Sequence, residues 1–215
     1  MSLPELWIVA GPNGAGKTTC VQKEPISQLL PNVTFFNPDD RTLAKLRSHG
    51  FQGFHDAPAE VQERSFIESA DEVFAELTEA IAGDVAVGVE TVLSTRKYCP
   101  LVDAVRVKQG FVGLIYVALT SPMIAKERVA ARVQRGGHGI PDEKIDQRWK
   151  RSLGHLPWFA SQATAFWVID NSSSDPTTPP VLLATGKRGF LEYLNDVAFA
   201  EMKADLSALP MMPSP

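Results

Sequence analysis

Short apolar runs alternate with amphipathic segments along most of this sequence. The apolar runs predict buried strands at 6–10, 33–36, 85–89, 112–119, 166–169 and 181–184. Helical spacing of apolar positions predicts helices at 17–30, 41–48, 59–82, 99–109, 122–134, 142–153 and 191–206. Apolar strands that alternate with helices are typical of an α/β fold, in which a mostly parallel sheet carries helices on both faces.

The clearest chemical motif follows the first predicted strand. It reads Gly11-Pro12-Asn13-Gly14-Ala15-Gly16-Lys17-Thr18 and matches G-x-x-x-x-G-K-[ST]. A strand, a Gly-rich loop and a helix N-terminus bring backbone N–H groups and the helix dipole together on phosphate oxygens. We therefore predict binding of a nucleoside triphosphate, with Lys17 on the β- and γ-phosphates and Thr18 on Mg²⁺. Thr19 is placed on the α-phosphate side. The loop alone does not reveal where the γ-phosphoryl group goes.

Length, charge and cysteine content narrow the class of protein. With 215 residues the chain can bury one substantial core, and we predict a single domain over 1–208 with a disordered tail at 209–215. The net charge of −4 does not favour a nucleic-acid partner. The two cysteines, Cys20 and Cys99, form neither a metal-binding nor a disulfide pattern. The apolar stretch 6–10 is too short for a signal peptide or a membrane span, so we expect a cytoplasmic enzyme without a membrane partner.

Acidic residues follow two of the predicted strands, at the sheet edge where α/β proteins bind ligands. Asp39 is the candidate general base, because a kinase needs a carboxylate that accepts the proton of the acceptor hydroxyl. It could equally cap a helix that begins near Arg41, as could Asp40, and residue chemistry alone does not decide. Glu90 could hold Mg²⁺ through water, accept a hydrogen bond from the substrate, or lie solvated at the strand end.

Two weaker signals lie further along the chain. Thr91 and Arg96 follow the third predicted strand and could extend a substrate pocket. Arg128 and Arg132 share one face of the helix predicted at 122–134, beside a Gly-rich break. Most basic helix faces are merely solvated. Downstream of a phosphate-binding loop, however, this pair favours a helical lid over about 122–154 that clamps the migrating phosphate.

The Gly-rich break itself contains a histidine. His138 stands in the run Gly136-Gly137-His138-Gly139, and no second histidine or cysteine stands at ligand spacing from it. We therefore interpret His138 as part of a lid or turn rather than as a metal ligand.

Taken together, four motifs resemble the zeta-toxin family of small-molecule kinases. They are residues 11–19, Phe36-Asn37-Pro38-Asp39-Asp40, Glu90-Thr91-Val92-Leu93-Ser94, and the stretch from Arg128-Val129 to Gly136-Gly137-His138-Gly139-Ile140-Pro141. The resemblance covers about 6–170, and the chain is similar in size to the compact chromosomal members. It implies a P-loop kinase-like three-layer sandwich that uses ATP and Mg²⁺ to phosphorylate a sugar hydroxyl of UDP-N-acetylglucosamine or a related metabolite.

The same resemblance implies roles for individual residues. Asp39 takes the catalytic position and Glu90 the substrate-binding position. Beside Glu90, we expect Asn37, Thr91 and Arg96 to contact the substrate. Lys17, Arg128 and Arg132 would contact the phosphates, without a distinction between the two arginines. It also implies an antitoxin protein as a partner.

Other functions remain open. Within the same class, the acceptor could be an antibiotic, a sugar alcohol or another small hydroxyl metabolite. From a different class, the chain could be a nucleotide-dependent switch that hydrolyses ATP slowly and changes its affinity for a partner. The absence of an obvious water-positioning glutamine weighs against the switch. A third reading is a protein that a helical antitoxin inhibits by covering the ATP site.

Overall fold

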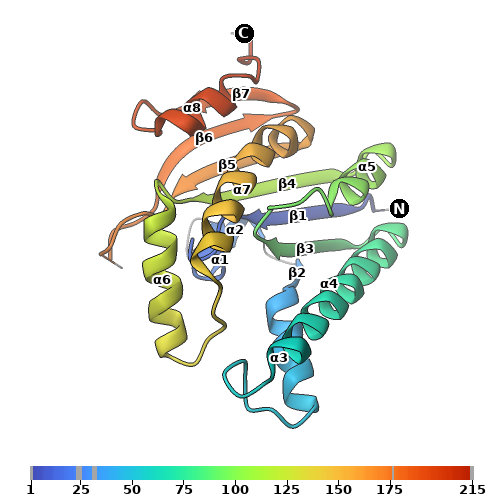
Figure 1. The fold of residues 1–215 in the computed structure, drawn as a ribbon. Helices are drawn as coiled ribbons and strands as arrows, with labels where there is room; N and C mark the ends of the chain where they lie inside the picture. Colours follow the sequence, from blue (N-terminus) through green and yellow to red (C-terminus); the bar gives the residue numbers. More distant parts are fainter. Residues whose placement is uncertain (1, 23–25, 31–32, 176, 214–215) are drawn as a thin grey trace.

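The computed structural model describes residues 2–22, 26–30, 33–175 and 177–213. Within them, seven strands form one sheet in the order β2-β3-β1-β4-β5-β6-β7 (Figure 1). The strands are β1 (Glu5–Ala10), β2 (Thr34–Phe36), β3 (Ala86–Thr91), β4 (Phe111–Ala118), β5 (Ala165–Asp170), β6 (Val181–Lys187) and β7 (Phe190–Leu194). The first five strands are parallel to one another, and β6 and β7 extend the sheet antiparallel.

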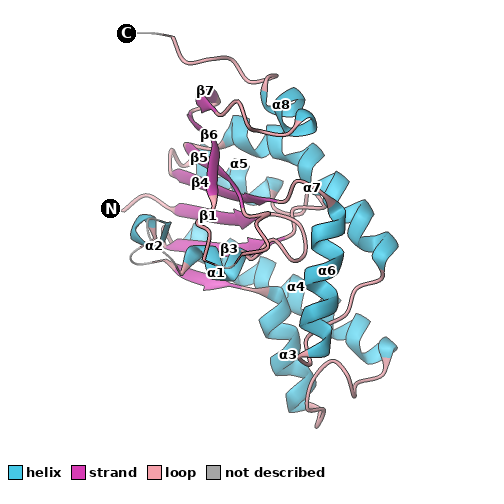
Figure 2. Cartoon of the chain, turned by 90° about the vertical axis from the view of Figure 1, so that its left-hand side faces the viewer, coloured by secondary structure: helices cyan, strands magenta, loops and turns pink. Residues whose placement is uncertain are grey.

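Helices cover both faces of the sheet. They are α1 (Lys17–Val21), α2 (Ile26–Leu29), α3 (Pro38–Ser48), α4 (Ala59–Ala82), α5 (Cys99–Val107), α6 (Pro122–Gln134), α7 (Asp142–Gln162) and α8 (Ala200–Leu206). Figure 2 shows α4, α5, α7 and α8 on one side of the sheet and α2 on the other. Cys20 of α1 packs in the second hydrophobic cluster, with Trp7 and Val9 of β1, on the face opposite the larger core. This confirms the predicted α/β fold. Among the described residues, none of the helices is long and apolar enough to cross a bilayer.

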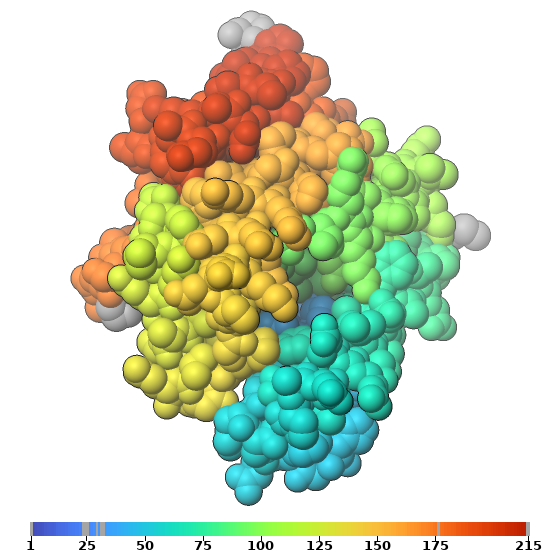
Figure 3. Space-filling view, in the orientation of Figure 1, coloured from blue at the N-terminus to red at the C-terminus, as the bar shows by residue number. Residues whose placement is uncertain are grey.

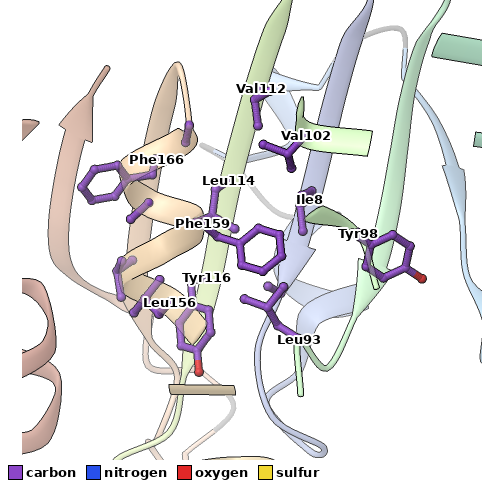
Figure 4. Packing of buried hydrophobic residues seen from close by; sticks show 14 of the residues in the cluster. Ile8, Leu93, Tyr98, Val102, Val112, Leu114, Tyr116, Leu156, Phe159 and Phe166 are labelled. Atoms are coloured by element: carbon purple, nitrogen blue, oxygen red, sulfur yellow. The ribbon is translucent and has the colours of Figure 1, made fainter. Parts of the chain in front are cut away.

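The larger hydrophobic core lies between the sheet and the helices α4, α5, α7 and α8. Figure 4 shows Leu156 and Phe159 of α7 beside Leu114 and Tyr116 of β4. All four side chains are fully or almost fully buried, and burying an aliphatic or aromatic side chain of this size contributes about 1.5–3 kcal/mol. The hydroxyl of Tyr116 is satisfied inside the core by Ser152 Oγ at 2.9 Å. The core therefore fixes the strands whose carboxyl ends carry the polar residues.

The predicted closing helix at 191–206 is wrong in its first half. Residues 190–194 form β7, and only Ala200–Leu206 is helical. A two-residue turn, Arg188 and Gly189 with φ of 51° and 80°, joins β6 to β7. Positive φ at both positions gives the twist that antiparallel hairpins need. The segment after α8 runs beside β7: Leu209 is buried, and the Leu191 N–H donates to the carbonyl of Pro210 at 2.8 Å. The sequence predicts a disordered tail at 209–215, whereas in the structure Leu209 and Pro210, the first residues of that segment, make these contacts.

Several helix boundaries also differ from the sequence prediction. The helix predicted at 142–153 continues to Gln162 through Pro157, because its apolar face packs on the sheet and outweighs a proline penalty of about 3 kcal/mol. The helix predicted at 17–30 is two short helices, α1 and α2, and part of the predicted span (23–25) lies outside the described residues. The helix expected from 41 begins at Pro38.

Candidate active site

The loop between β1 and α1 has the backbone geometry of a phosphate cradle. Gly11, Gly14 and Gly16 all have positive φ, at 142°, 73° and 81°. The positive φ of Gly16 favours glycine, and a Cβ atom there would lie 2.7 Å from the side-chain nitrogen of Asn171, which would have to move. That nitrogen donates to the carbonyl of Ala15 at 2.8 Å. The segment after β5 is therefore fastened to the loop.

Lys17 folds back onto the loop that precedes it. Its Nζ donates to the carbonyls of Gly11 and Pro12, at 3.0 and 3.2 Å. Burial lowers the pKa of Lys17, while the charges of Glu90 and Asp39 act in the opposite direction. The ammonium group thus lies within electrostatic reach of both acids that the sequence singled out.

Thr18 and Glu90 are in contact where β1 and β3 reach their carboxyl ends. The Thr18 hydroxyl donates to Glu90 Oε2 at 2.8 Å. The contact arises because β1 and β3 are adjacent and parallel, with Val9 paired to Glu90, so β3 ends beside the start of α1. A hydroxyl and a carboxylate oxygen are the ligand types that Mg²⁺ prefers. Thr19, the third predicted loop contact, is exposed on α1.

Asn37, rather than its neighbour Asp39, caps α3. The Asn37 side chain accepts a hydrogen bond from the Asp39 N–H at 2.9 Å, and Pro38 occupies the first turn of α3. Asn37 is therefore the cap of this helix, so the alternative in which Asp39 or Asp40 caps it is wrong. The Asp39 carboxylate is exposed and lines a cavity with Lys17. Asp40 lines a different cavity, and burial followed by the Asp39 charge raises its pKa.

The cavity beside Asp39 has a volume of about 550 Å³. In Figure 1, α6 and α3 extend beyond the sheet. The cavity is lined by residues of α3, α4, α7 and the segment between α6 and α7. Figure 3 shows a hollow between α7 and α4, with atoms of the N-terminal part of the chain at its bottom. Its walls bring together six of the predicted site residues: Asn13, Lys17, Asn37, Asp39, Glu90 and Thr91. Asn13 Oδ1 is buried and has no hydrogen-bond partner in the structure, among the described residues.

Further side chains on the cavity wall were not expected from the sequence. Tyr98 lines it, and burial followed by the Asp39 charge raises the pKa of this phenol to about 12, so its hydroxyl stays a donor at neutral pH. Lys144 and Arg148 of α7 line it as well. These two cations stand four positions apart inside the predicted lid, the same spacing that drew attention to Arg128 and Arg132. That spacing could have identified them.

The two predicted lid arginines lie in different places. Arg128 crosses the phosphate loop, donating to the carbonyls of Gly14 at 3.2 Å and Ser173 at 2.7 Å. Arg132 instead donates to the carbonyl of His138 at 2.8 Å, and its charge acts to lower the pKa of Lys17. Arg128 is therefore placed at the loop and the segment after β5, whereas Arg132 is placed near the buried lysine.

Two other predicted substrate contacts have local partners. Arg96 is not among the cavity-lining residues; its guanidinium lies 5.3 Å from the ring centroid of Trp158. Thr91 lines the cavity, and its hydroxyl accepts a hydrogen bond from the Leu93 N–H at 3.1 Å. The structure therefore brings Thr91, but not Arg96, to the predicted site.

Comparison with known proteins places the fold. No family model matches the sequence, and no curated protein matches it significantly. A chain of the AvrRxo1-ORF1:AvrRxo1-ORF2 complex with sulphate has a TM-score of 0.68 at 12% identity, covering 91% of this chain and 62% of that one. A chain of the AvrRxo1-ORF1:-ORF2 complex with ATP has a TM-score of 0.64 at 14% identity, covering 98% of this chain and 64% of that one. A chain from a structure of the PezAT chromosomal toxin–antitoxin system of Streptococcus pneumoniae has a TM-score of 0.52 at 13% identity, covering 79% of this chain and 68% of that one.

These likenesses concern the fold. The chain spans 62–64% of the length of the matching AvrRxo1 chains and shares few residues with them. At this level of identity the likenesses show that the chain shares the α/β fold of these structures, which include the PezAT toxin–antitoxin system, and to that extent they confirm the resemblance drawn from the sequence.

Proposed function

We propose that this protein is an ATP-dependent kinase that transfers a γ-phosphoryl group to the hydroxyl of a small molecule. One observation carries the proposal: Lys17 of the phosphate loop and Asp39, whose side chain is not needed to cap α3, line the same cavity. A phosphate donor held by the loop and an acceptor hydroxyl held by Asp39 would therefore face each other. This is the arrangement that in-line phosphoryl transfer requires.

The loop and its neighbours fit MgATP. The positive-φ glycines leave room for close approach of phosphate oxygens, and Lys17 supplies a buried positive charge. Thr18 and Glu90 would hold Mg²⁺, Thr18 directly and Glu90 directly or through water. When bound, Mg²⁺ supplies charge neutralisation for the β- and γ-phosphates. The solved complex with ATP, which has the same fold, supports ATP as the nucleotide.

Asp39 would orient the acceptor hydroxyl and accept its proton as the new phosphate ester forms. It stands in the first turn of α3 and lines the cavity that Lys17 also lines. Arg132 lies near Lys17 and would balance negative charge on the transferred group. Arg128, held across the loop, would instead act on the bound nucleotide.

For the acceptor, we propose a nucleotide sugar such as UDP-N-acetylglucosamine. The cavity volume of about 550 Å³ lies in the range of small-molecule sites. Lys144 and Arg148 on its wall suit an acceptor that carries phosphate groups, and the ring of Phe66 suits a flat or apolar moiety. Another hydroxyl metabolite or an antibiotic would use the same Asp39 chemistry without these cations.

The test is product analysis. Purified protein is incubated with MgATP and a panel of nucleotide sugars, sugar alcohols and hydroxylated antibiotics, and each mixture is analysed by mass spectrometry. The proposal predicts that a nucleotide sugar gains one phosphate group. If ATP is consumed only when a second protein is added, and no compound of the panel gains phosphate, the protein is a switch and the kinase assignment fails.

We also propose a protein inhibitor of the antitoxin type. The PezAT system, with which this chain shares its fold, supports such a partner. The partner would cover the nucleotide site, so ATP would compete with it. Co-expression of the product of a short neighbouring reading frame, followed by co-purification with and without ATP, checks this. Lack of any complex with such a product contradicts it.

A further inference from the structure

The two glycines after α6 turn the chain back over Arg132. Gly136 has a φ of 84° and closes the helix through a hydrogen bond from its N–H to the carbonyl of Val133 at 2.9 Å. Gly137 packs directly on Arg132: a Cβ atom there would lie 2.5 Å from Arg132 Cγ. The next residue, His138, receives the guanidinium of Arg132 on its carbonyl at 2.8 Å. The position of Arg132 thus depends on where His138 lies.

The ring of His138 is held by the opposite side of the cavity. Its centroid lies 4.8 Å from that of Phe54, in the loop between α3 and α4, and 4.5 Å from that of Phe66 on α4. Phe54 and Phe66 stack on each other with centroids 5.5 Å apart, and Phe54 is buried with Leu46 in a small separate core. We call this three-ring arrangement the His138 contact. It joins the lid to the loop between α3 and α4 and to α4 itself.

The surroundings of the ring favour its neutral form. Burial lowers the pKa of His138, and the charges of Arg132 and Arg148 lower it further, while Asp39 acts in the opposite direction. Glu63 of α4 and Lys144 of α7 line the same cavity. The Nδ1 atom is buried and has no hydrogen-bond partner among the described residues. A neutral ring packed on two phenyl rings needs no ion-pair partner, so the contact is aromatic rather than ionic.

We propose that His138 is a positioning residue that closes the acceptor cavity and holds Arg132 in place. His138, Gly139, Ile140 and Pro141 line the cavity on the lid side, and Phe66 lines it on the side of α4. When the His138 contact forms, the lid wall is fixed against α4, and the backbone carbonyl of His138 fixes the guanidinium of Arg132. The kinetic part of this proposal rests on the kinase function proposed above; the lid-closing part does not.

The lid-closing part is tested by hydrogen exchange of the peptide that covers 136–141 in the full chain. His138→Ala should exchange about tenfold faster than the wild type, because two aromatic contacts are lost. His138→Phe should exchange like the wild type, since a phenyl ring can pack on Phe54 and Phe66. His55→Ala, which changes an exposed residue of the same α3–α4 loop, serves as the control and should have no effect. Equal exchange in wild type and His138→Ala, or fast exchange in His138→Phe, would overturn the proposal.

The pH dependence of lid exchange is a second measurement of the His138 contact. Burial in the His138 contact lowers the pKa of His138. The contact is therefore strongest at a pH above the ordinary pKa of histidine, and it weakens as the pH falls below that pKa. Between about pH 7.5 and about pH 5.5, lid exchange in the wild type should rise relative to His138→Phe. An unchanged ratio overturns this part. Neither exchange measurement needs phosphoryl transfer, so both can succeed even if no compound of the acceptor panel is phosphorylated.

The positioning role is tested with an acceptor that the product analysis identifies. His138→Ala should raise the KM for the acceptor and lower kcat, with the Kd of ATP unchanged, and His138→Phe should restore both. If His138→Ala weakens ATP binding as much as acceptor binding, the residue supports the whole lid rather than the cavity and Arg132.

Discussion

The hydroxyl of Thr18 donates a hydrogen bond to the carboxylate of Glu90 at 2.8 Å, joining the start of α1 to the end of β3. The two side chains that could bind a divalent cation are therefore in direct contact, although they are far apart in the sequence. This geometry favours a metal-linked role for Glu90, which the sequence left open among three alternatives.

Replacing Glu90 by Gln should weaken the response to Mg²⁺. The amide keeps the shape but loses the charge that complements the cation, and changes of this kind near a metal typically cost about 10- to 100-fold in affinity. The measurement is a Mg²⁺ titration of ATP binding by calorimetry. Glu127→Gln, an exposed substitution on α6, is the matched control. An unchanged Mg²⁺ midpoint in Glu90→Gln would instead favour a contact with the acceptor.

The two lid arginines should give separable defects. Arg128 contacts the loop carbonyl of Gly14 and the segment after β5, so Arg128→Ala should raise the Kd of ATP. Arg132 lies near Lys17 and contacts His138, so Arg132→Ala should lower kcat by about 10²- to 10³-fold with little change in ATP affinity. Fluorescence titration with an ATP analogue and steady-state kinetics distinguish them. Identical defects in both variants would contradict this division.

The buried pair of Tyr116 and Ser152 should behave as a unit in stability. Tyr116→Phe leaves the buried Ser152 hydroxyl without its partner and should lower the free energy of unfolding by about 1–3 kcal/mol. Adding Ser152→Ala removes the unpaired group, so the double variant should recover part of that loss. Urea denaturation of the wild type, both single variants and the double variant measures the coupling. Purely additive effects would show that the pair does not interact.

Much of the fold followed from the sequence because parallel strands are apolar on both faces and leave clear runs. The helix bounds at 59–82 and 122–134 were predicted correctly, since each helix has a clear stop or start signal, such as Pro122. The hairpin between β6 and β7 was missed because Arg188 is an unusual residue at a positive φ, where Asn, Asp or Gly is expected. Pro157 was misleading, since only tertiary packing keeps α7 helical through it.

The site was predicted unevenly for a related reason. The phosphate loop and Asp39 stand in contiguous motifs, whereas Tyr98, Lys144 and Arg148 reach the cavity only through the packing of α7 and the loop before α5. The role of Asn37 depended on one hydrogen bond that decides which residue starts α3. Arg96 was misplaced because a flexible cation next to a motif can as well pack on an aromatic ring, here that of Trp158.

The central claim is that Asp39 activates the acceptor hydroxyl across the cavity from Lys17. The most direct test is single-turnover transfer from MgATP to the identified acceptor, comparing Asp39→Asn with Asp40→Asn. Both residues lie in the first turn of α3, but Asp40 lines the other cavity, so it is a matched control. Asp39→Asn should slow transfer by about 10²- to 10⁴-fold with the Kd of ATP unchanged, and Asp40→Asn should stay near the wild-type rate. Transfer by Asp39→Asn at the wild-type rate would contradict the account.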